Sequence, residues 1–247
     1  MPISTAILLA GGSGNRMQGQ VEDKILANLG GKPVIAHSID AFVSSGQLQH
    51  LVIVVRDATQ QAEVEKVASA LLNGPFSVTF TYGGAQRQDS VWAGLQAAPG
   101  DTEVVLIHDC ARPCVTPAAI RESIAKAAQI GAACLARPVT DTIKSADAYD
   151  GAFLPTTVDR AKLWAMETPQ SFQYSIIKDA YQSVIRSGAQ ITDDLSAIED
   201  IDQPVAFVDN TRPNPKLTTP ADLPYLEYLL QPLSSSSPSS SLVSPSD

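Results

Sequence analysis

The sequence predicts an α/β fold in three layers: a doubly wound, mostly parallel sheet with helices on both faces. The first observation behind this prediction is a repeated alternation of short apolar segments with stretches that carry helical signals. The second observation is that the polar clusters GGSGNRM, GGAQRQDS and HDCARP each follow an apolar segment directly. Because ligands of parallel α/β sheets bind at the carboxyl ends of the strands, these clusters mark the expected site.

Composition restricts the class of protein. The chain has 247 residues, of which 44% are hydrophobic and 17% are charged, which suits one large α/β core or two small ones. A formal net charge of −9 argues against a general nucleic-acid binder, because a phosphate backbone requires a basic face. The longest apolar runs are too short to span a bilayer, and the N-terminal segment lacks a signal-peptide pattern. The three cysteines lack metal-ligand spacing and are interpreted as reduced thiols, so we expect a cytoplasmic protein with no membrane partner.

Each element is predicted from its local pattern. Strands are expected at residues 5–10, 50–56, 76–81, 103–109 and 132–138, and those through buried positions are almost wholly apolar, as is typical of strands buried on both faces. Helices are expected at 33–44, with Pro33 in the first turn, at 58–72 and 89–97, and at 117–130 behind Thr116 as a cap. Further helices are expected at 175–187, at 193–201 and after Pro220. This order implies right-handed crossovers between parallel strands.

The alternation of strands and helices stops after residue 138. Residues 138–172 are rich in Thr, Asp and turn signals and poor in helix signals, so we expect an extended β-arm inserted in the domain. The Ser/Pro-rich residues 233–247 are unable to bury a core and are expected to be disordered. The prediction is therefore one domain over residues 1–232 and a tail.

The first polar cluster is a candidate anion site. Gly12 and Gly14 follow the first strand, where exposed backbone N–H groups can approach an anion. No Gly-Lys-Ser/Thr closes the loop, so it is not a Walker A motif, and Met17 stands where a dinucleotide fingerprint has its third glycine. Taken alone, the loop is equally compatible with a tight turn that binds nothing. Arg16 and Lys24 bracket the next stretch and favour phosphate binding.

Seven motifs along the chain together resemble a known family. They are LLAGGSGNRM…DK, GGAQRQDSVWAGL, LIHDCARPCV, PVTDTIK, TVDRAKLWAMETPQSF, ITDDLSAIE and NPKLTTPADL, in this order. Over residues 4–230 the chain resembles the 2-C-methyl-D-erythritol 4-phosphate cytidylyltransferases, nucleotidyltransferases of the non-mevalonate isoprenoid pathway. The resemblance implies a Rossmann-like nucleotidyltransferase fold with a β-arm used for dimerisation.

The resemblance also implies a reaction. A phosphate oxygen of methylerythritol phosphate attacks the α-phosphorus of CTP, which gives 4-diphosphocytidyl-2-C-methyl-D-erythritol and pyrophosphate. Because the nucleophile is already an anion, positioning and charge neutralisation matter more than a strong base. The implied cofactor is Mg²⁺, bound mainly through the CTP phosphates, and the implied partner is a second copy of the chain, whose arm completes a shared site.

The matching positions imply roles for individual residues. The catalytic residues are Arg16 and Lys24, which stabilise the transition state, and Arg160 and Lys216, which hold the attacking phosphate. The nucleotide-binding residues are Ala10, Gly11, Gly12, Gly14, Gly84, Arg87 and Ser90. The substrate-binding residues are Asp109, Arg112, Thr142, Arg160, Thr168 and Thr192, and Asp109 is also a candidate Mg²⁺ ligand.

Three positions depart from the family pattern. Ala85 stands where an acidic residue is expected, and Asn15 and Asp23 replace the more usual Arg and Pro of the first loop. These differences bear on nucleotide choice more than on reaction type. Two alternatives stay open: a ribitol-5-phosphate cytidylyltransferase, which shares the architecture, and a nucleotide-binding module without catalytic activity.

Overall fold

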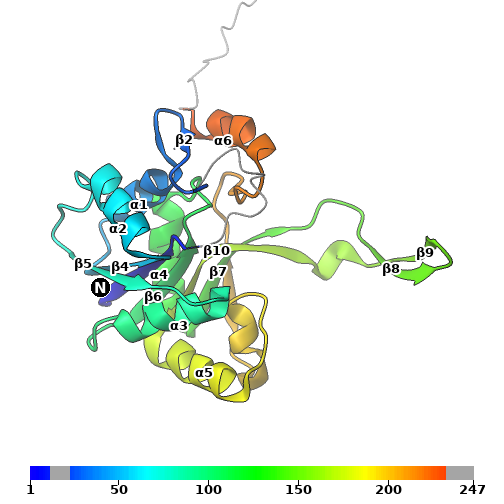
Figure 1. Ribbon diagram of the computed structural model, residues 1–247. Helices are drawn as coiled ribbons and strands as arrows, with labels where there is room; N and C mark the ends of the chain where they lie inside the picture. Colours follow the sequence, from blue (N-terminus) through cyan, green and yellow to red (C-terminus); the bar gives the residue numbers. More distant parts are fainter. Residues whose placement is uncertain (12–22, 232–247) are drawn as a thin grey trace, which may run out of the picture.

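A seven-stranded sheet forms the centre of the molecule (Figure 1). The computed structural model describes residues 1–11 and 23–231. The strands of the sheet are β1 (Ser4–Leu9), β4 (His50–Val55), β5 (Ser77–Tyr82), β6 (Val104–Asp109), β7 (Ala132–Pro138), β10 (Trp164–Gln173) and β11 (Val205–Val208). They lie in the order β11-β7-β10-β6-β1-β4-β5, and only β10 runs antiparallel to its neighbours. The mostly parallel sheet is therefore confirmed.

Helices cover both faces of this sheet (Figure 1). Side chains of β1 alternate between the faces, so that Leu8 belongs to one core cluster and Ile7 to another. The first cluster packs under α1 (Val34–Ser44), α2 (Ala58–Ala68) and α4 (Pro117–Ile130). The second packs under α3 (Arg87–Ala97) and α5 (Tyr174–Ser187). These three layers confirm the predicted fold class.

Strand β10 differs from the prediction, which placed its residues inside the arm. Residues 167–172 are buried in the centre of the sheet between β6 and β7, so the predicted arm of residues 138–172 is too long at its C-terminal end. Proline argues against a central strand, and Pro169 interrupts the apolar pattern here. In the structure the register shifts between Met166 and Gln170, so Pro169 has no place in the hydrogen-bonded ladder.

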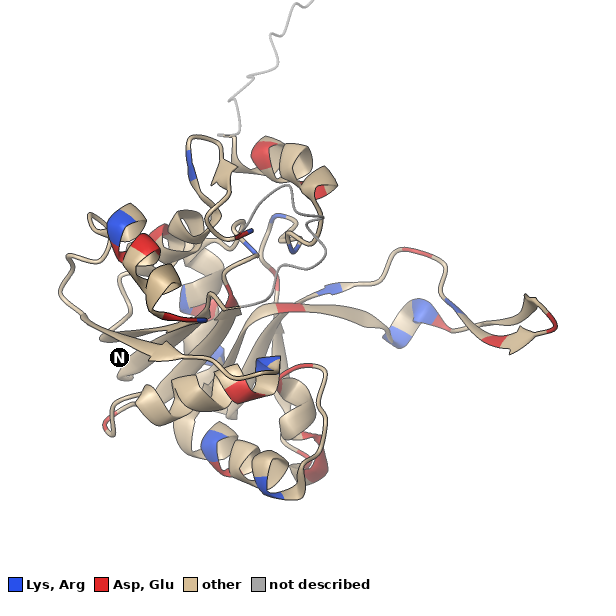
Figure 2. Ribbon diagram, in the orientation of Figure 1, with Lys and Arg blue, Asp and Glu red and all other residues tan. Residues whose placement is uncertain are grey.

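The arm itself is a long connection between β7 and β10 that projects away from the sheet (Figure 1). It carries β8 (Lys144–Tyr149) and β9 (Ala152–Thr157), which form a separate two-stranded sheet, followed by the 3₁₀ turn η2 (Arg160–Lys162). Every residue of β8 and β9 is exposed. Acidic and basic residues are interspersed along the arm (Figure 2). An isolated two-stranded hairpin is marginally stable, so this arm is suited to packing against another surface.

Residues 193–201 form two 3₁₀ turns, η3 (Leu195–Ala197) and η4 (Glu199–Ile201), where the sequence predicts one helix. The reason is a contact that lies far away in sequence. The side-chain oxygen of Gln170 accepts hydrogen bonds from the backbone N–H groups of Asp194 and Leu195, at 2.9 and 3.0 Å. These bonds fix the start of the segment on β10 and replace the regular helical pattern.

A third, smaller core cluster lies at the C-terminal end of the described chain. The 3₁₀ turn η5 (Pro220–Asp222) leads into helix α6 (Leu223–Leu230), which packs against the short strand β2 (Asn28–Leu29). Strand β2 pairs with β3 (Lys32–Pro33). The predicted helix after Pro220 is thus confirmed, whereas strand β11 was not predicted. Among the described helices, none has both the length and the apolar character that crossing a bilayer requires. The expected disorder at 233–247 concerns positions outside the described residues.

Candidate active site

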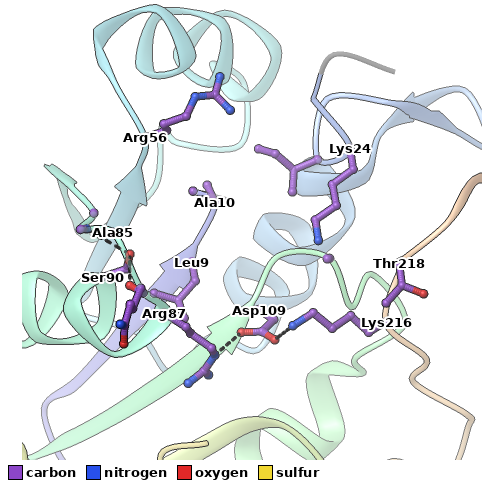
Figure 3. Close-up of a pocket in the computed structure, with 16 residues that line it drawn as sticks. Leu9, Ala10, Lys24, Arg56, Ala85, Arg87, Ser90, Asp109, Lys216 and Thr218 are labelled. Atoms are coloured by element: carbon purple, nitrogen blue, oxygen red, sulfur yellow. Dashed lines mark hydrogen bonds and ion pairs between the residues drawn. The ribbon is translucent and has the colours of Figure 1, made fainter. Parts of the chain in front are cut away.

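A cavity of about 650 Å³ opens at the carboxyl ends of β1, β4, β5 and β6 (Figure 3). This is the edge of the sheet at which the sequence placed the ligand. Predicted site residues from distant parts of the chain meet there: Ala10, Gly11, Lys24, Gly84, Arg87, Ser90, Asp109 and Lys216.

The turn from β5 into α3 builds one wall of the cavity. The hydroxyl of Ser90 accepts a hydrogen bond from the N–H of Gly84 at 3.2 Å. A Cβ atom at Gly84 would lie 2.3 Å from the Cβ of Asp89, so the close turn requires glycine there. Ala85 lines the same wall and brings no charge to it. Besides Gln86 and Arg87, this wall presents backbone groups and the hydroxyl of Ser90.

Asp109, at the end of β6, lies between two cations. Nζ of Lys216 is 2.5 Å from Oδ2, and Nε of Arg87 donates to Oδ1 at 3.1 Å (Figure 3). Burial by itself would raise the pKa of Asp109, but the charges of Arg87 and Lys216 hold it well below its usual range. Asp109 is therefore ionised at neutral pH. Lys24 points toward this pair from the opposite side of the cavity (Figure 3).

Arg87 lines the cavity, yet its guanidinium is directed at carboxylates. Nη1 and Nη2 donate to the two oxygens of Asp194 at 2.9 and 2.8 Å, in a bidentate pair. Burial alone would lower the pKa of Arg87, but Asp194 and Asp109 raise it above its ordinary value. Each side-chain nitrogen of Arg87 thus contacts a carboxylate. The nucleotide contact that the sequence assigns to Arg87 stays a prediction.

Hydrogen bonds to backbone carbonyl groups anchor the segment that carries Lys216. Nη1 of Arg112 donates to the carbonyl oxygen of Asn214 at 2.8 Å, and the N–H of Leu217 donates to Ala111 at 2.7 Å. The side-chain amide of Asn214 donates to the carbonyl of Thr168 at 3.0 Å. Arg112, predicted to bind substrate, therefore holds the lysine segment against the end of β6 and is not among the residues that line the cavity.

The side chain of Thr168 also contacts other protein groups instead of the cavity. Its hydroxyl accepts a hydrogen bond from the N–H of Asp109 at 3.1 Å and lies 3.0 Å from Nδ1 of His108. The side chain is buried and does not line the cavity. Thr168 therefore supports the backbone of Asp109, and its predicted contact with substrate stays a prediction.

Three predicted residues lie away from this cavity within the chain. Thr142 and Arg160 are exposed on the arm, where Nη1 of Arg160 donates to the carbonyl of Thr140. Thr192 is exposed beside η3, with its hydroxyl 3.5 Å from that of Ser196. Gly12, Gly14 and Arg16 lie outside the described residues, as does Asn15.

The surroundings of Asp109 leave little room for a metal ion. Both of its carboxylate oxygens already contact cations, so a metal ion there would have to displace Lys216 or Arg87. Within residues 1–11 and 23–231, no group of three His, Cys, Asp or Glu side chains is arranged to hold a metal. The described residues therefore do not fit a protein-held metal ion at Asp109.

Sequence reasoning missed the residues that surround the entry to the first loop. Arg56, which follows β4, lines the cavity and lies 3.5 Å from Asp23. The buried amide of Gln60 donates to the carboxylate of Asp23 at 2.5 Å and to the carbonyl of Ala10 at 3.2 Å, so it links these two residues. The position of Arg56 directly after a strand was the available signal. Asp23, one of the departures from the family pattern, therefore contacts both Arg56 and Gln60.

Comparison with known sequences identifies relatives of the whole chain. A family model described as 2-C-methyl-D-erythritol 4-phosphate cytidylyltransferase matches residues 4–232. The protein of this name from Desulforamulus reducens is 38% identical over 226 residues, which cover 92% of this chain and 95% of the relative. The protein of the same name from Geobacillus kaustophilus is 40% identical, with 91% and 96% covered.

Solved structures extend the similarity to the fold. The 4-diphosphocytidyl-2C-methyl-D-erythritol synthase from Anaerococcus prevotii matches with a TM-score of 0.77 at 26% identity and covers 94% of this chain and 97% of that one. The 2-C-methyl-D-erythritol 4-phosphate cytidylyltransferase from Thermus thermophilus gives a TM-score of 0.71 at 27% identity, with 93% and 98% covered. The sequence match over nearly the full length and the shared fold lead to one conclusion: the chain belongs to the 2-C-methyl-D-erythritol 4-phosphate cytidylyltransferase family.

Proposed function

We propose that this chain transfers the cytidylyl group of CTP to 2-C-methyl-D-erythritol 4-phosphate and releases pyrophosphate. The observation that carries the proposal is the convergence of Lys24, Lys216 and Asp109 on one cavity at the carboxyl edge of the sheet. The names of the relatives identify the substrates of this family, and the cavity supplies the cations that the reaction needs.

Lys216 has a direct part in this mechanism. Its ammonium nitrogen lies 2.5 Å from Oδ2 of Asp109. An incoming phosphate group carries more charge than a carboxylate and competes for the lysine. When the acceptor phosphate takes Lys216, the freed oxygen of Asp109 is able to accept a hydroxyl group of the polyol. Lys216 would then hold the phosphate of the acceptor and Asp109 one of its hydroxyl groups, so the acceptor would be oriented at both ends.

The chemical step is a displacement at the α-phosphorus of CTP. An oxygen of the acceptor phosphate forms the new P–O bond, and the bond to the β-phosphate breaks, so that pyrophosphate leaves with its electron pair. The attacking oxygen is already anionic, so no side chain has to remove a proton. Lys24, and Arg16 from outside the described residues, would stabilise the charge on the phosphates. Charge neutralisation on the CTP phosphates is the chemistry that a bound Mg²⁺ would supply.

The same proposal includes a cytoplasmic homodimer with shared sites. Thr142 and Arg160 lie on an exposed arm and outside the chain's own cavity, which supports delivery to the cavity of a second copy. Tyr149, Phe153 and Leu154 expose 62%, 68% and 56% of their surface on the same arm. An apolar surface of this kind is typical of protein contacts.

The test is pyrophosphate release in the presence of Mg²⁺. A panel of nucleoside triphosphates is crossed with 2-C-methyl-D-erythritol 4-phosphate and ribitol 5-phosphate, using protein whose folding has been verified. We expect release with CTP and methylerythritol phosphate. A requirement for ribitol 5-phosphate would move the chain to the alternative acceptor, and a requirement for another nucleotide would point to Ala85. Binding of CTP without release for any acceptor would contradict the enzyme assignment and favour the non-catalytic module.

A further inference from the structure

Asp194 is a buried carboxylate that the proposed mechanism does not use. It has no exposed surface and accepts two hydrogen bonds from Arg87, at 2.9 and 2.8 Å. The hydroxyl of Tyr181, on α5, donates to Oδ1 of Asp194 at 2.5 Å. The carbonyl oxygen of the Gln170 side chain accepts the N–H of Asp194 at 2.9 Å. A buried charge is costly unless it is paired and hydrogen-bonded, and here every available partner is supplied.

This network reaches the cavity through one atom of Arg87. Because Asp194 takes both Nη atoms, only Nε is directed at Asp109, and it contacts Oδ1 alone at 3.1 Å. Oδ2 of Asp109 is thereby left to Lys216. The negative charges of the two carboxylates, Asp109 and Asp194, equal the positive charges of the two cations that contact them. If Asp194 were neutral, the whole charge of Arg87 would act on Asp109, and its planar group would be free to take both oxygens.

We propose that Asp194 and Tyr181 are positioning residues for the part of the cavity, around Asp109 and Lys216, that binds the acceptor substrate. They hold Arg87 in the one orientation that leaves Oδ2 of Asp109 for Lys216 and then for a polyol hydroxyl. Neither residue lines the cavity, so each acts through Arg87. This inference rests on the proposed function and deepens it, because it names the residues that prepare Asp109 for the acceptor.

The network predicts a selective kinetic defect. Tyr181→Phe removes the 2.5 Å hydrogen bond without a change in shape, and Asp194→Asn removes the charge. Tyr174→Phe is the matched control, because Tyr174 is a buried tyrosine of the same helix whose hydroxyl donates to the carbonyl of Leu95 at 2.7 Å, outside the network. Steady-state pyrophosphate release is measured while CTP and methylerythritol phosphate are varied separately. Thermal unfolding of each protein is recorded alongside.

In Tyr181→Phe and Asp194→Asn we expect KM for methylerythritol phosphate to rise about tenfold, the scale of a lost buried hydrogen bond to a charged group. KM for CTP should change less than about twofold, and Tyr174→Phe should match the wild type. A KM for methylerythritol phosphate that stays unchanged in folded Tyr181→Phe protein would overturn the inference, and so would equal rises for both substrates. If Asp194→Asn fails to fold, Tyr181→Phe decides alone. Lack of release by the wild-type chain would count against the proposed function itself, which separates the two failures.

Discussion

The ammonium group of Lys24 faces Asp109 and Lys216 across the cavity (Figure 3). We predict that Lys24→Ala lowers kcat by about 10²–10³-fold, because the substitution removes positive charge where negative charge develops on the phosphates. The measurement is pyrophosphate release at saturating CTP and acceptor. Lys32→Ala is the control, since Lys32 forms an exposed pair with Asp40 at 2.7 Å and does not line this cavity. A kcat near the wild-type value for Lys24→Ala would show that the active site is misplaced.

His108 gives the folded chain a specific dependence on pH. It is fully buried against Phe42, with ring centroids 5.0 Å apart, and burial lowers its pKa to about 4. In the unfolded chain histidine titrates near pH 6.5, so between about pH 6.5 and 4 the unfolded state binds more protons than the folded state. Stability should therefore fall as the pH is lowered through this window, by about 3 kcal/mol for this group.

The measurement is urea unfolding of the wild type and of His108→Gln at about pH 7 and about pH 4.5. The variant should lose this part of the pH dependence, whatever its stability at neutral pH. Burial lowers the pKa of His37 as well, so the difference between the two proteins, and not the slope of either, isolates His108. Equal slopes would contradict the prediction.

Residues at the cavity were predictable to different degrees. Asp109 and Lys216 follow motifs that the sequence displays, and the structure brings them into contact. Asp194 lies in the ITDDLSAIE motif and Arg56 directly follows a strand, but neither position indicates which side chain it contacts, and Tyr181 belongs to no such motif. The hydrogen bond between Tyr181 and Asp194 joins α5 to the residue that precedes η3, and only the packed fold brings the two side chains together. Local sequence patterns do not predict contacts between residues that lie far apart in the sequence.

At the scale of elements, helix α4 shows how local signals agree. Thr116 precedes Pro117, and its hydroxyl accepts the N–H of Ala119 at 3.2 Å, so the predicted bounds of 117–130 are confirmed. Strand β10 shows the reverse. Its Thr and Pro residues suggest a loop, yet pairing with β6 and β7 on both sides makes it a central strand. Long-range pairing decided this element, and local propensity did not.

The cap of α4 supports a stability prediction. Thr116→Ala should lower the free energy of unfolding by about 1 kcal/mol, because the first turn of the helix loses an acceptor for a free N–H group. The hydroxyl also donates to Oδ1 of Asn210 at 3.2 Å, which links the helix to the segment after β11. Thr116→Ser keeps the oxygen and should retain most of the stability in the same urea titration. An equal loss in both variants would assign the effect to the methyl group instead.

At the scale of the whole molecule, the arm predicts association. The full chain of 26.1 kDa should sediment with about twice that mass as the dimer proposed above. Phe153→Asp places a charge on the exposed apolar surface of the arm and should shift the equilibrium toward the monomer. Tyr228→Asp on α6 is a control at a residue with the same exposed fraction, 68%. A wild-type chain that is monomeric and fully active would rule out shared sites.

The position of the arm has a consequence for how this architecture diversifies. The arm joins β7 and β10, which are adjacent in the sheet, with Trp164 paired to Pro138 at its root. A loop between adjacent strands can be lengthened, shortened or replaced at a small entropic cost and without disturbing the register of the sheet. The proposed nucleotide-binding residues Gly11, Gly84 and Ser90 belong to other segments. If the arm binds the acceptor as proposed, replacing the arm would change the acceptor substrate and leave the nucleotide substrate the same.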